Sequence, residues 1–164
     1  MTEPVPFDPT ALLRTLVEHR VRFILIGGFA AAFHGSTQLT VDVDITPDSS
    51  AENLAQLSAA LTAVKAKIRT EAGSHRFKHD AASLARAEMW NLSTPHGDLD
   101  ITFRPAGTQG YADLHRDAVT AAVLGIEIEV ASLADVIRSK EAADRPKDRA
   151  ALPLLRRLLE DQDG

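Results

Sequence analysis

The sequence predicts an α/β fold in which helices flank a mixed β-sheet and a short helical part lies at the C-terminal end. An apolar run rich in β-branched residues at 21–26 is typical of a buried strand, and two glycines join it to a short helical segment. Residues 41–45 alternate between apolar and acidic side chains, which indicates a strand with two different faces. Residues 88–94 and 99–103 flank a Pro-His-Gly-Asp turn that is typical of a hairpin. Because helix-linked and hairpin-linked strands both occur, we expect parallel and antiparallel pairs in one sheet.

The helices are predicted from apolar stripes and from the residues that can cap them. Asp8 can cap a first helix with Pro9 at its first position, and Ser132 can cap a late one. Arg145-Pro146 separates the last two helices, because proline removes a hydrogen bond from a helix interior. The expected order is a helix from residue 9, strand 21–26, helix 29–34, strand 41–45, helix 51–67, a loop at 68–80, a short helix at 81–87, strands 88–94 and 99–103, helix 111–122, strand 126–130, and helices 133–143 and 147–160.

Length and composition limit the class of protein. At 164 residues we expect one domain over residues 1–164, with a core at about 10–131 and C-terminal helices at about 132–161. There are no cysteines, which excludes disulfides and thiolate metal sites. No apolar run approaches the roughly 20 residues that span a bilayer, so we expect no membrane partner. The N-terminus lacks the basic and apolar segments of a signal peptide, which favours a cytoplasmic location.

The charges are unevenly distributed along the chain. The formal net charge of −5 argues against a general nucleic-acid coat protein. Lysines and arginines are nevertheless concentrated at 138–157, and a second basic group lies at 75–79. Local positive patches suit a polyanionic substrate held at one site, and solvated helix surfaces are the alternative explanation.

Three aspartates are candidates for chemistry. Asp42 and Asp44 share one face of their strand, roughly 6.5–7 Å apart along it. Like charges this close are unfavourable unless a cation or a proton relieves them. Asp100 lies in a second apolar-flanked strand, whereas neighbouring Asp98 has either a turn role or a metal role. If the two strands are neighbours, three carboxylates meet, and such a set suits two Mg²⁺ ions rather than zinc.

Gly27 and Gly28 end the first strand just before a helix. Glycines there let backbone N–H groups approach an anion, so they predict a phosphate contact. The alternative is that the turn needs glycine for its geometry alone. The Walker phosphate loop and the dinucleotide-binding pattern are both absent.

Together these motifs resemble the polymerase-β-like nucleotidyltransferase superfamily, through Gly27-Gly28, Asp42-x-Asp44 and Asp100. Over residues 21 to about 158, the sequence resembles still more closely the AbiEii-type nucleotidyltransferases. These proteins are toxins of bacterial type IV toxin–antitoxin systems. The stretches similar to theirs are Ile26-Gly27-Gly28-Phe29-Ala30-Ala31, His34-Gly35-Ser36, Asp42-Val43-Asp44-Ile45, Gly97-Asp98-Leu99-Asp100, Ser132-Leu133, Ser139-Lys140-Glu141-Ala142 and Arg145-Pro146-Lys147-Asp148-Arg149.

The resemblance implies a nucleotidyltransferase fold and a Mg²⁺-dependent reaction. A nucleoside monophosphate would pass from an NTP to an acceptor hydroxyl, and pyrophosphate would leave. Asp42, Asp44 and Asp100 would hold two metal ions, and Asp100 would also help to activate the acceptor hydroxyl. A resemblance to these toxins also implies an RNA acceptor, the 3′ end of tRNA, and a cognate antitoxin protein.

The resemblance assigns the substrate contacts as well. The backbone at Gly27-Gly28, with Ser36, would hold the β- and γ-phosphates. Lys140 and Asp148 would serve the nucleotide end of the site, and a surface ion pair is the alternative for them. The chain departs from many relatives after Ser36, where it has Thr-Gln-Leu and they carry an arginine.

Two other functions remain open from the residues. A nucleotidyltransferase could modify a small molecule such as an aminoglycoside, or a protein hydroxyl. A non-catalytic NTP- or RNA-binding module on the same fold is a third reading. The three clustered aspartates argue against that reading, because a module that only binds phosphate does not need them.

Overall fold

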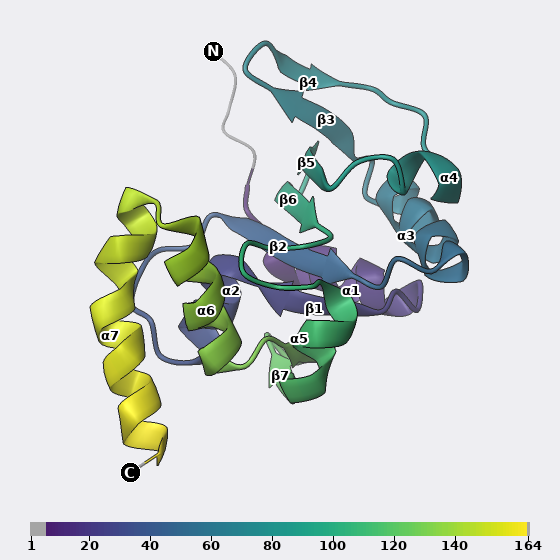
Figure 1. Ribbon diagram of the computed structural model, residues 1–164. Helices are drawn as coiled ribbons and strands as arrows, with labels where there is room; N and C mark the ends of the chain where they lie inside the picture. The colour runs from purple at the N-terminus through teal and green to yellow at the C-terminus, as the bar shows by residue number, and fades with distance from the viewer. Residues whose placement is uncertain (1–5, 164) are drawn as a thin grey trace.

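The computed structural model describes residues 6–163, and its centre is an eight-stranded mixed sheet. The strand order is β4-β3-β5-β6-β2-β1-β8-β7. Figure 1 shows the sheet with helices α6 and α7 beside each other at one side and the β3–β4 hairpin at another. The elements are α1 (Pro9–Glu18), β1 (Phe23–Ile26), α2 (Gly27–Phe33), β2 (Asp42–Pro47), α3 (Ala51–Ala63), β3 (Lys67–Thr70), β4 (Gly73–His75), α4 (Ala81–Leu84), β5 (Met89–Thr94), β6 (Gly97–Thr102), α5 (Tyr111–Asp117), β7 (Val119–Val123), β8 (Ile126–Val130), α6 (Leu133–Ala143) and α7 (Pro146–Asp163).

The sheet combines hairpins with parallel neighbours. The pairs β1–β2, β5–β6, β3–β4 and β7–β8 are antiparallel, whereas β2–β6 and β1–β8 are parallel. The central neighbours β2 and β6 therefore run in the same direction although residues 48–96 of the sequence lie between them. This arrangement confirms the prediction of a mixed sheet flanked by helices.

The two faces of β2 and β6 have different surroundings. Val43, Ile45, Leu99 and Ile101 are fully or almost fully buried and belong to the hydrophobic core. Burying side chains of this size stabilises the fold by roughly 2 kcal/mol each. The aspartates between them point to the opposite face, because side chains alternate along a strand. The core thus fixes the register that brings the acidic side chains together.

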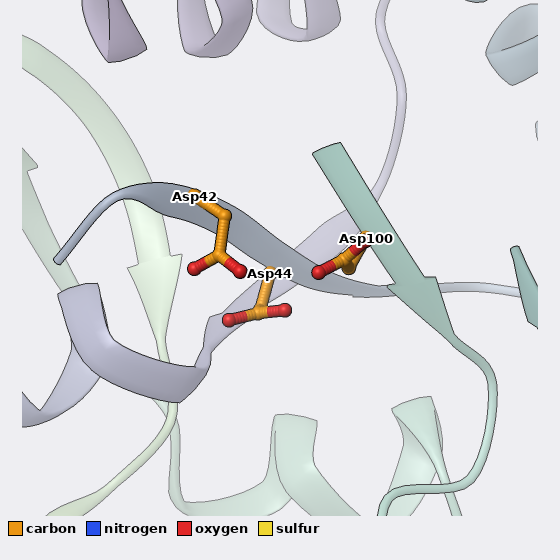
Figure 2. A group of neighbouring side chains, drawn as sticks. All are labelled: Asp42, Asp44 and Asp100. Atoms are coloured by element: carbon orange, nitrogen blue, oxygen red, sulfur yellow. The ribbon is translucent and has the colours of Figure 1, made fainter. Parts of the chain in front are cut away.

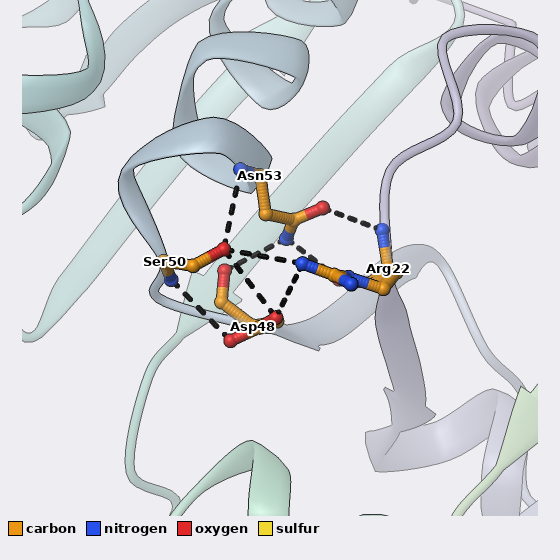
Figure 3. Close-up of polar contacts among 4 residues, drawn as sticks. All are labelled: Arg22, Asp48, Ser50 and Asn53. Atoms are coloured by element: carbon orange, nitrogen blue, oxygen red, sulfur yellow. Dashed lines mark hydrogen bonds and ion pairs between the residues drawn. The ribbon is translucent and has the colours of Figure 1, made fainter.

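A buried asparagine anchors the other end of the β1–β2 pair (Figure 3). Asn53 on α3 accepts a hydrogen bond from the Arg22 backbone N–H, and its side-chain amide donates to the carbonyls of Arg22 and Asp48. Its exposed fraction is 0%, so these bonds satisfy a polar group that would otherwise be costly to bury. Ser50 caps α3 by accepting a hydrogen bond from the Asn53 backbone. The network holds β1, β2 and α3 in one arrangement.

Most of the predicted elements are confirmed, and the predicted caps at Asp8 and Ser132 are made. Three predictions were wrong. Residues 68–80, expected to be a loop, contain most of β3 and all of β4, and the helix expected at 51–67 ends at Ala63, where the chain turns through a left-handed Lys65. Residues 111–122, expected to be one helix, form α5 and then β7.

Candidate active site

The register of β2 and β6 places four aspartates opposite one another. Asp42 lies opposite Asp98, and Asp44 lies opposite Asp100. Because the strands are parallel neighbours, side chains at paired positions project from the same face. The sequence predicted that Asp42 and Asp44 would share a face and that Asp100 would join them if its strand were a neighbour of theirs, and β6 is the parallel neighbour of β2.

Asp42, Asp44 and Asp100 form one cluster, which we call the carboxylate cluster. One oxygen atom of each lies within 4.8 Å of the others, and all three side chains are half-buried. Figure 2 shows the three carboxylates converging, two from β2 and one from β6. Oxygen-only ligands at this spacing fit Mg²⁺ or Mn²⁺ rather than zinc.

The carboxylate cluster is electrostatically unfavourable without a cation. Burial, reinforced by the charges of Asp42 and Asp100, raises the pKa of Asp44 to about 7. Burial also raises the pKa of Asp100, and the nearby Arg69 opposes this shift. A site that holds a proton on one carboxyl near neutral pH is a site where a divalent cation is a strong competitor for that proton.

Arg69 is a charged neighbour that the sequence analysis did not single out. Its Nη2 donates to Asp100 Oδ1 at 2.8 Å, and its Nη1 lies 3.3 Å from Asp98 Oδ2. Asp98 therefore has an arginine partner and lies outside the carboxylate cluster. Arg69 belongs to β3, in the segment that the sequence predicted as a loop, so no local pattern pointed to it.

Gly27 and Gly28 lie immediately against this acidic face. A methyl group on Gly27 would lie 2.2 Å from Asp44 Oδ2, and one on Gly28 would lie 2.4 Å from Thr40 Oγ1. Gly27 also has a φ of +68°, which side chains disfavour. Glycine is thus required here both by backbone conformation and by the close approach of Asp44.

A pocket of about 540 Å³ opens over the carboxylate cluster and the two glycines. This volume is within the range of sites that bind small molecules. Residues from β5, α6, the start of α7, the junction between these two helices, and the two loops at 38–41 and 105–108 complete its wall, among them Thr40, Met89, Asn91, Ser139, Lys140, Arg145 and Lys147. The pocket therefore has carboxylates on its β2–β6 side and cations on its α6–α7 side.

Buried Asp148 joins the two C-terminal helices. Its side chain is 0% exposed and lies 3.6 Å from Lys140 Nζ and 2.7 Å from Arg145 Nε. Burial alone would raise the pKa of Asp148, but hydrogen bonds from Arg145 and the charge of Lys140 hold it below the ordinary value. Lys140 and Arg145 line the pocket, so Asp148 acts on it by holding both of them.

The remaining predicted contact, Ser36, lies in the loop between α2 and β2. Its backbone N–H donates to the Ala31 carbonyl at 2.9 Å, and its hydroxyl accepts from the Gln38 N–H at 3.3 Å. The pocket wall in this loop is made by residues 38–41, and Ser36 is not part of it. Thr40, whose hydroxyl lies beside Gly28, is a polar group on that wall that the sequence analysis did not identify.

The basic segment at 138–157 is largely neutralised within the fold. Its ion pairs are Arg138 with Asp113 and Asp135, Lys140 and Arg145 with Asp148, Arg149 with Asp144, and Arg156 with Glu141. Lys147 makes no ion pair within 4.0 Å among residues 6–163, and it lines the pocket. Its charge lowers the pKa of Asp44, against the effect of burial.

Comparison with solved structures identifies the fold. LnuA, a lincosamide antibiotic adenylyltransferase crystallised with lincomycin, superposes with a TM-score of 0.62 at 16% identity, over 93% of this chain and 99% of that one. The antibiotic-resistance factor ANT(2'')-Ia, in complex with adenylyl-2''-tobramycin, gives a TM-score of 0.60 at 15% identity, over 94% and 89%. A Thermotoga maritima protein assigned as a nucleotidyltransferase gives 0.53 at 17% identity, over 94% and 96%. The sequence itself matches no protein-family model and no curated protein. The chain therefore has the nucleotidyltransferase fold.

Proposed function

We propose that this protein is a Mg²⁺-dependent nucleotidyltransferase that moves a nucleoside monophosphate from an NTP to an acceptor hydroxyl. The observation that carries the proposal is the carboxylate cluster, which lies beside Gly27 and Gly28 at the start of α2 on a nucleotidyltransferase fold. Three carboxylates placed together have no structural benefit, because they repel one another, and the pKa values of Asp44 and Asp100 are raised as a result of burial and this repulsion. A binding module without chemistry would gain nothing from them.

The donor set fits the proposed metal. The described residues of the cluster offer only carboxylate oxygens, which are the ligands that Mg²⁺ takes from proteins. When bound, such ions neutralise the charge that develops on the attacking and leaving oxygens of a phosphoryl transfer. Asp42, Asp44 and Asp100 are the residues that would hold two of them.

The proposed reaction forms one bond, breaks one bond and moves one proton to a side chain. The acceptor oxygen forms a bond to the α-phosphorus of the NTP while the bond from that phosphorus to the bridging oxygen breaks. Pyrophosphate takes the electron pair of the broken bond. Asp100, at the β6 edge of the carboxylate cluster, is the group we assign to receive the proton of the acceptor hydroxyl.

Cations on the opposite wall suit the polyphosphate. Lys140 and Arg145, both held by Asp148, present positive charge to the pocket, and Lys147 adds a charge without an acidic partner in the described chain. The backbone at Gly27 and Gly28 lets the phosphates approach the sheet closely. We assign Ser36 a supporting role in this loop, through its hydrogen bond with Gln38.

For the acceptor we propose RNA, at the 3′ end of tRNA, and a role as the toxin of a toxin–antitoxin pair with a cognate antitoxin. The motifs shared with AbiEii-type toxins support this assignment. The exposed cations Arg76 and Lys78 add to it, because they follow the β3–β4 hairpin on the β6 side of the sheet. A small-molecule acceptor is the second candidate, because LnuA and ANT(2'')-Ia act on antibiotics.

Label transfer tests the proposal directly. The protein is incubated with each α-labelled NTP, Mg²⁺ and total RNA, and in parallel with an aminoglycoside or a lincosamide. We expect label on RNA, pyrophosphate release, and no transfer by Asp44→Asn. Label on the antibiotic alone would replace the RNA assignment with the second candidate, and no label in either reaction would refute the transferase activity.

Growth of an expressing bacterium tests the toxin role separately. Expression of the wild type is expected to arrest growth, and expression of Asp44→Asn at the same level is not. Equal growth of the two strains would contradict the toxin role while leaving the chemistry open to the labelling assay.

A further inference from the structure

Arg69 contacts the carboxylate cluster from a strand that is not adjacent to it. It lies on β3, and β5 separates β3 from β6 in the sheet. The side chain spans β5, and its Nη2 reaches Asp100 Oδ1 at 2.8 Å. The Asp100 side chain is only 14% exposed, so few water molecules compete for this oxygen. A carboxylate bound at one oxygen by a guanidinium loses most of its freedom to rotate.

Two further contacts fix the guanidinium group itself. Its Nη1 donates to the Leu92 carbonyl on β5 at 2.8 Å and lies 3.3 Å from Asp98 Oδ2 on β6. All three partners belong to strands of one sheet, so the group is positioned without any bound ligand. Arginine suits this task because its planar fork of donors can satisfy several acceptors at defined angles.

We propose that Arg69 is a positioning residue that holds Asp100 in the orientation in which it meets Asp42 and Asp44. The inference rests on the proposed function, since it concerns the residues assigned to the metal. Held in this way, Asp100 keeps one oxygen within 4.8 Å of the other two carboxylates. Partners that orient a metal ligand from behind typically account for roughly 10–100-fold in metal affinity or activity.

A different role for Arg69 would be that of a simple counter-charge. The two roles predict opposite signs. If only charge mattered, removing a positive group beside a cation site would strengthen cation binding, because repulsion is lost, provided that the pH is high enough to keep Asp100 ionised with and without Arg69. If orientation matters, removing the group weakens cation binding. A substitution that keeps the positive charge but loses the planar set of guanidinium donors distinguishes the two roles further.

The test is calorimetric titration of the full chain with Mn²⁺, in the absence of NTP. We expect Arg69→Gln to bind Mn²⁺ roughly 10-fold more weakly than the wild type, and Arg69→Lys to be weakened as well. The matched control is Arg104→Gln, which removes a guanidinium–carboxylate pair with Glu88 at 2.7 Å at the far end of the same β5–β6 pair. Its Mn²⁺ affinity should equal that of the wild type.

Either of two results would overturn the inference. One is unchanged or tighter Mn²⁺ binding by Arg69→Gln, and the other is wild-type affinity in Arg69→Lys. Circular dichroism establishes that each variant is folded, and Arg69→Lys remains informative if Arg69→Gln is not. The titration needs no turnover, so a protein that shows the expected Mn²⁺ pattern but transfers no nucleotide would refute the proposed function and leave the role of Arg69 standing.

Discussion

Asp44 and Asp148 are both withdrawn from water, yet their surroundings shift their acidities in opposite directions. Burial raises the pKa of Asp44 to about 7, and the neighbouring carboxylates Asp42 and Asp100 add to the effect. Burial acts in the same direction on Asp148, but Arg145 and Lys140 overcome it and lower the pKa of that group. The difference lies in the partners, because one aspartate is surrounded by acids and the other by bases.

This contrast separates the residues that we propose to bind a metal ion from a residue that keeps other side chains in position. The carboxylate cluster reduces the stability of the protein without a cation, and such a cost is typical of a functional site. The ion pairs of Asp148 stabilise the junction of α6 and α7 and keep Lys140 and Arg145 at the pocket. A loss of activity therefore has a different meaning at each of the two positions.

The largest expected effect is on stability, at Asp148. Asp148→Ala removes the fully buried carboxylate that pairs with Lys140 and Arg145 and leaves these two like charges without their partner, which costs about 3 kcal/mol in the free energy of unfolding. Urea denaturation measures it. The control is Glu141→Ala, which removes an exposed ion pair between the same two helices, Glu141–Arg156, and costs under about 1 kcal/mol. Equal losses in the two variants would contradict the structural role of Asp148.

Asp44→Asn should lose activity but gain stability, in contrast to the loss of stability expected for Asp148→Ala. It is expected to lower nucleotide transfer more than about 100-fold, beyond the effect of losing an outer partner of a metal ligand. It should also stabilise the metal-free protein by roughly 2 kcal/mol above pH 7, where the folded protein must otherwise keep Asp44 ionised beside two other carboxylates, and this gain shrinks as the pH falls below 7 and Asp44 takes up a proton in the folded state. Below about pH 4 the carboxyl is protonated in both states and the gain disappears. Destabilisation of the metal-free protein at pH 8 would show that the cluster is not strained.

Glycine variants sharpen the contrast by introducing bulk rather than removing charge. Gly27 and Gly125 both have a positive φ, +68° and +79°, but only Gly27 has a neighbour within 4 Å of a built methyl group. Gly125→Ala measures the backbone cost alone, about 1 kcal/mol of unfolding free energy. Gly27→Ala is expected to lose roughly 100-fold in transfer as well, because it displaces Asp44. Full activity in folded Gly27→Ala would contradict the proposed site.

The raised pKa of Asp44 predicts a pH dependence of metal binding. Below pH 7 a cation must displace the proton that Asp44 holds, so Mn²⁺ affinity should be about tenfold weaker at pH 6 than at pH 8. Asp148 does not contribute to the pH dependence of Mn²⁺ affinity in this range, because its pKa is below the ordinary value of an aspartate. Calorimetric titration at several pH values checks this, and a flat profile would argue that Asp44 does not bind the ion.

The smallest expected effect is at Lys147. Lys147→Gln should raise the KM for NTP about fivefold, equivalent to about 1 kcal/mol, with kcat nearly unchanged, because a ground-state contact to the phosphates is lost. Arg149→Gln is the control, since Arg149 pairs with Asp144 and does not line the pocket. A change in kcat without a change in KM would place Lys147 in the transition state instead.

Sequence patterns predicted the parts of the site that depend on local structure. Strand alternation placed Asp42 and Asp44 on one face, and the glycines marked the turn next to them. The β7 strand was missed because Ala121 and Ala122 favour a helix as readily as a strand, and pairing with β8 decides the outcome. Arg69 was missed because its partner is thirty-one residues away and on a strand whose neighbours no local pattern reveals.

The same limit applied to the basic segment at 138–157. Its clustering of cations suggested an exposed patch, but most of these cations pair with acids between residues 135 and 148, and Arg138 also pairs with Asp113 on α5. Once these pairs form, Lys147 is the cation at the start of α7 that has no acidic partner within 4.0 Å among residues 6–163. Tertiary pairing thus decides which charges are available for a substrate, and composition does not.

Anomalous diffraction from crystals soaked with Mn²⁺ and a non-hydrolysable NTP tests the central claim most directly. The account predicts a manganese peak about 2.1 Å from oxygens of Asp42 and Asp44, with Asp100 beside it and the phosphates between the cluster and Lys140. A manganese peak elsewhere, or a nucleotide bound away from this pocket, would contradict it.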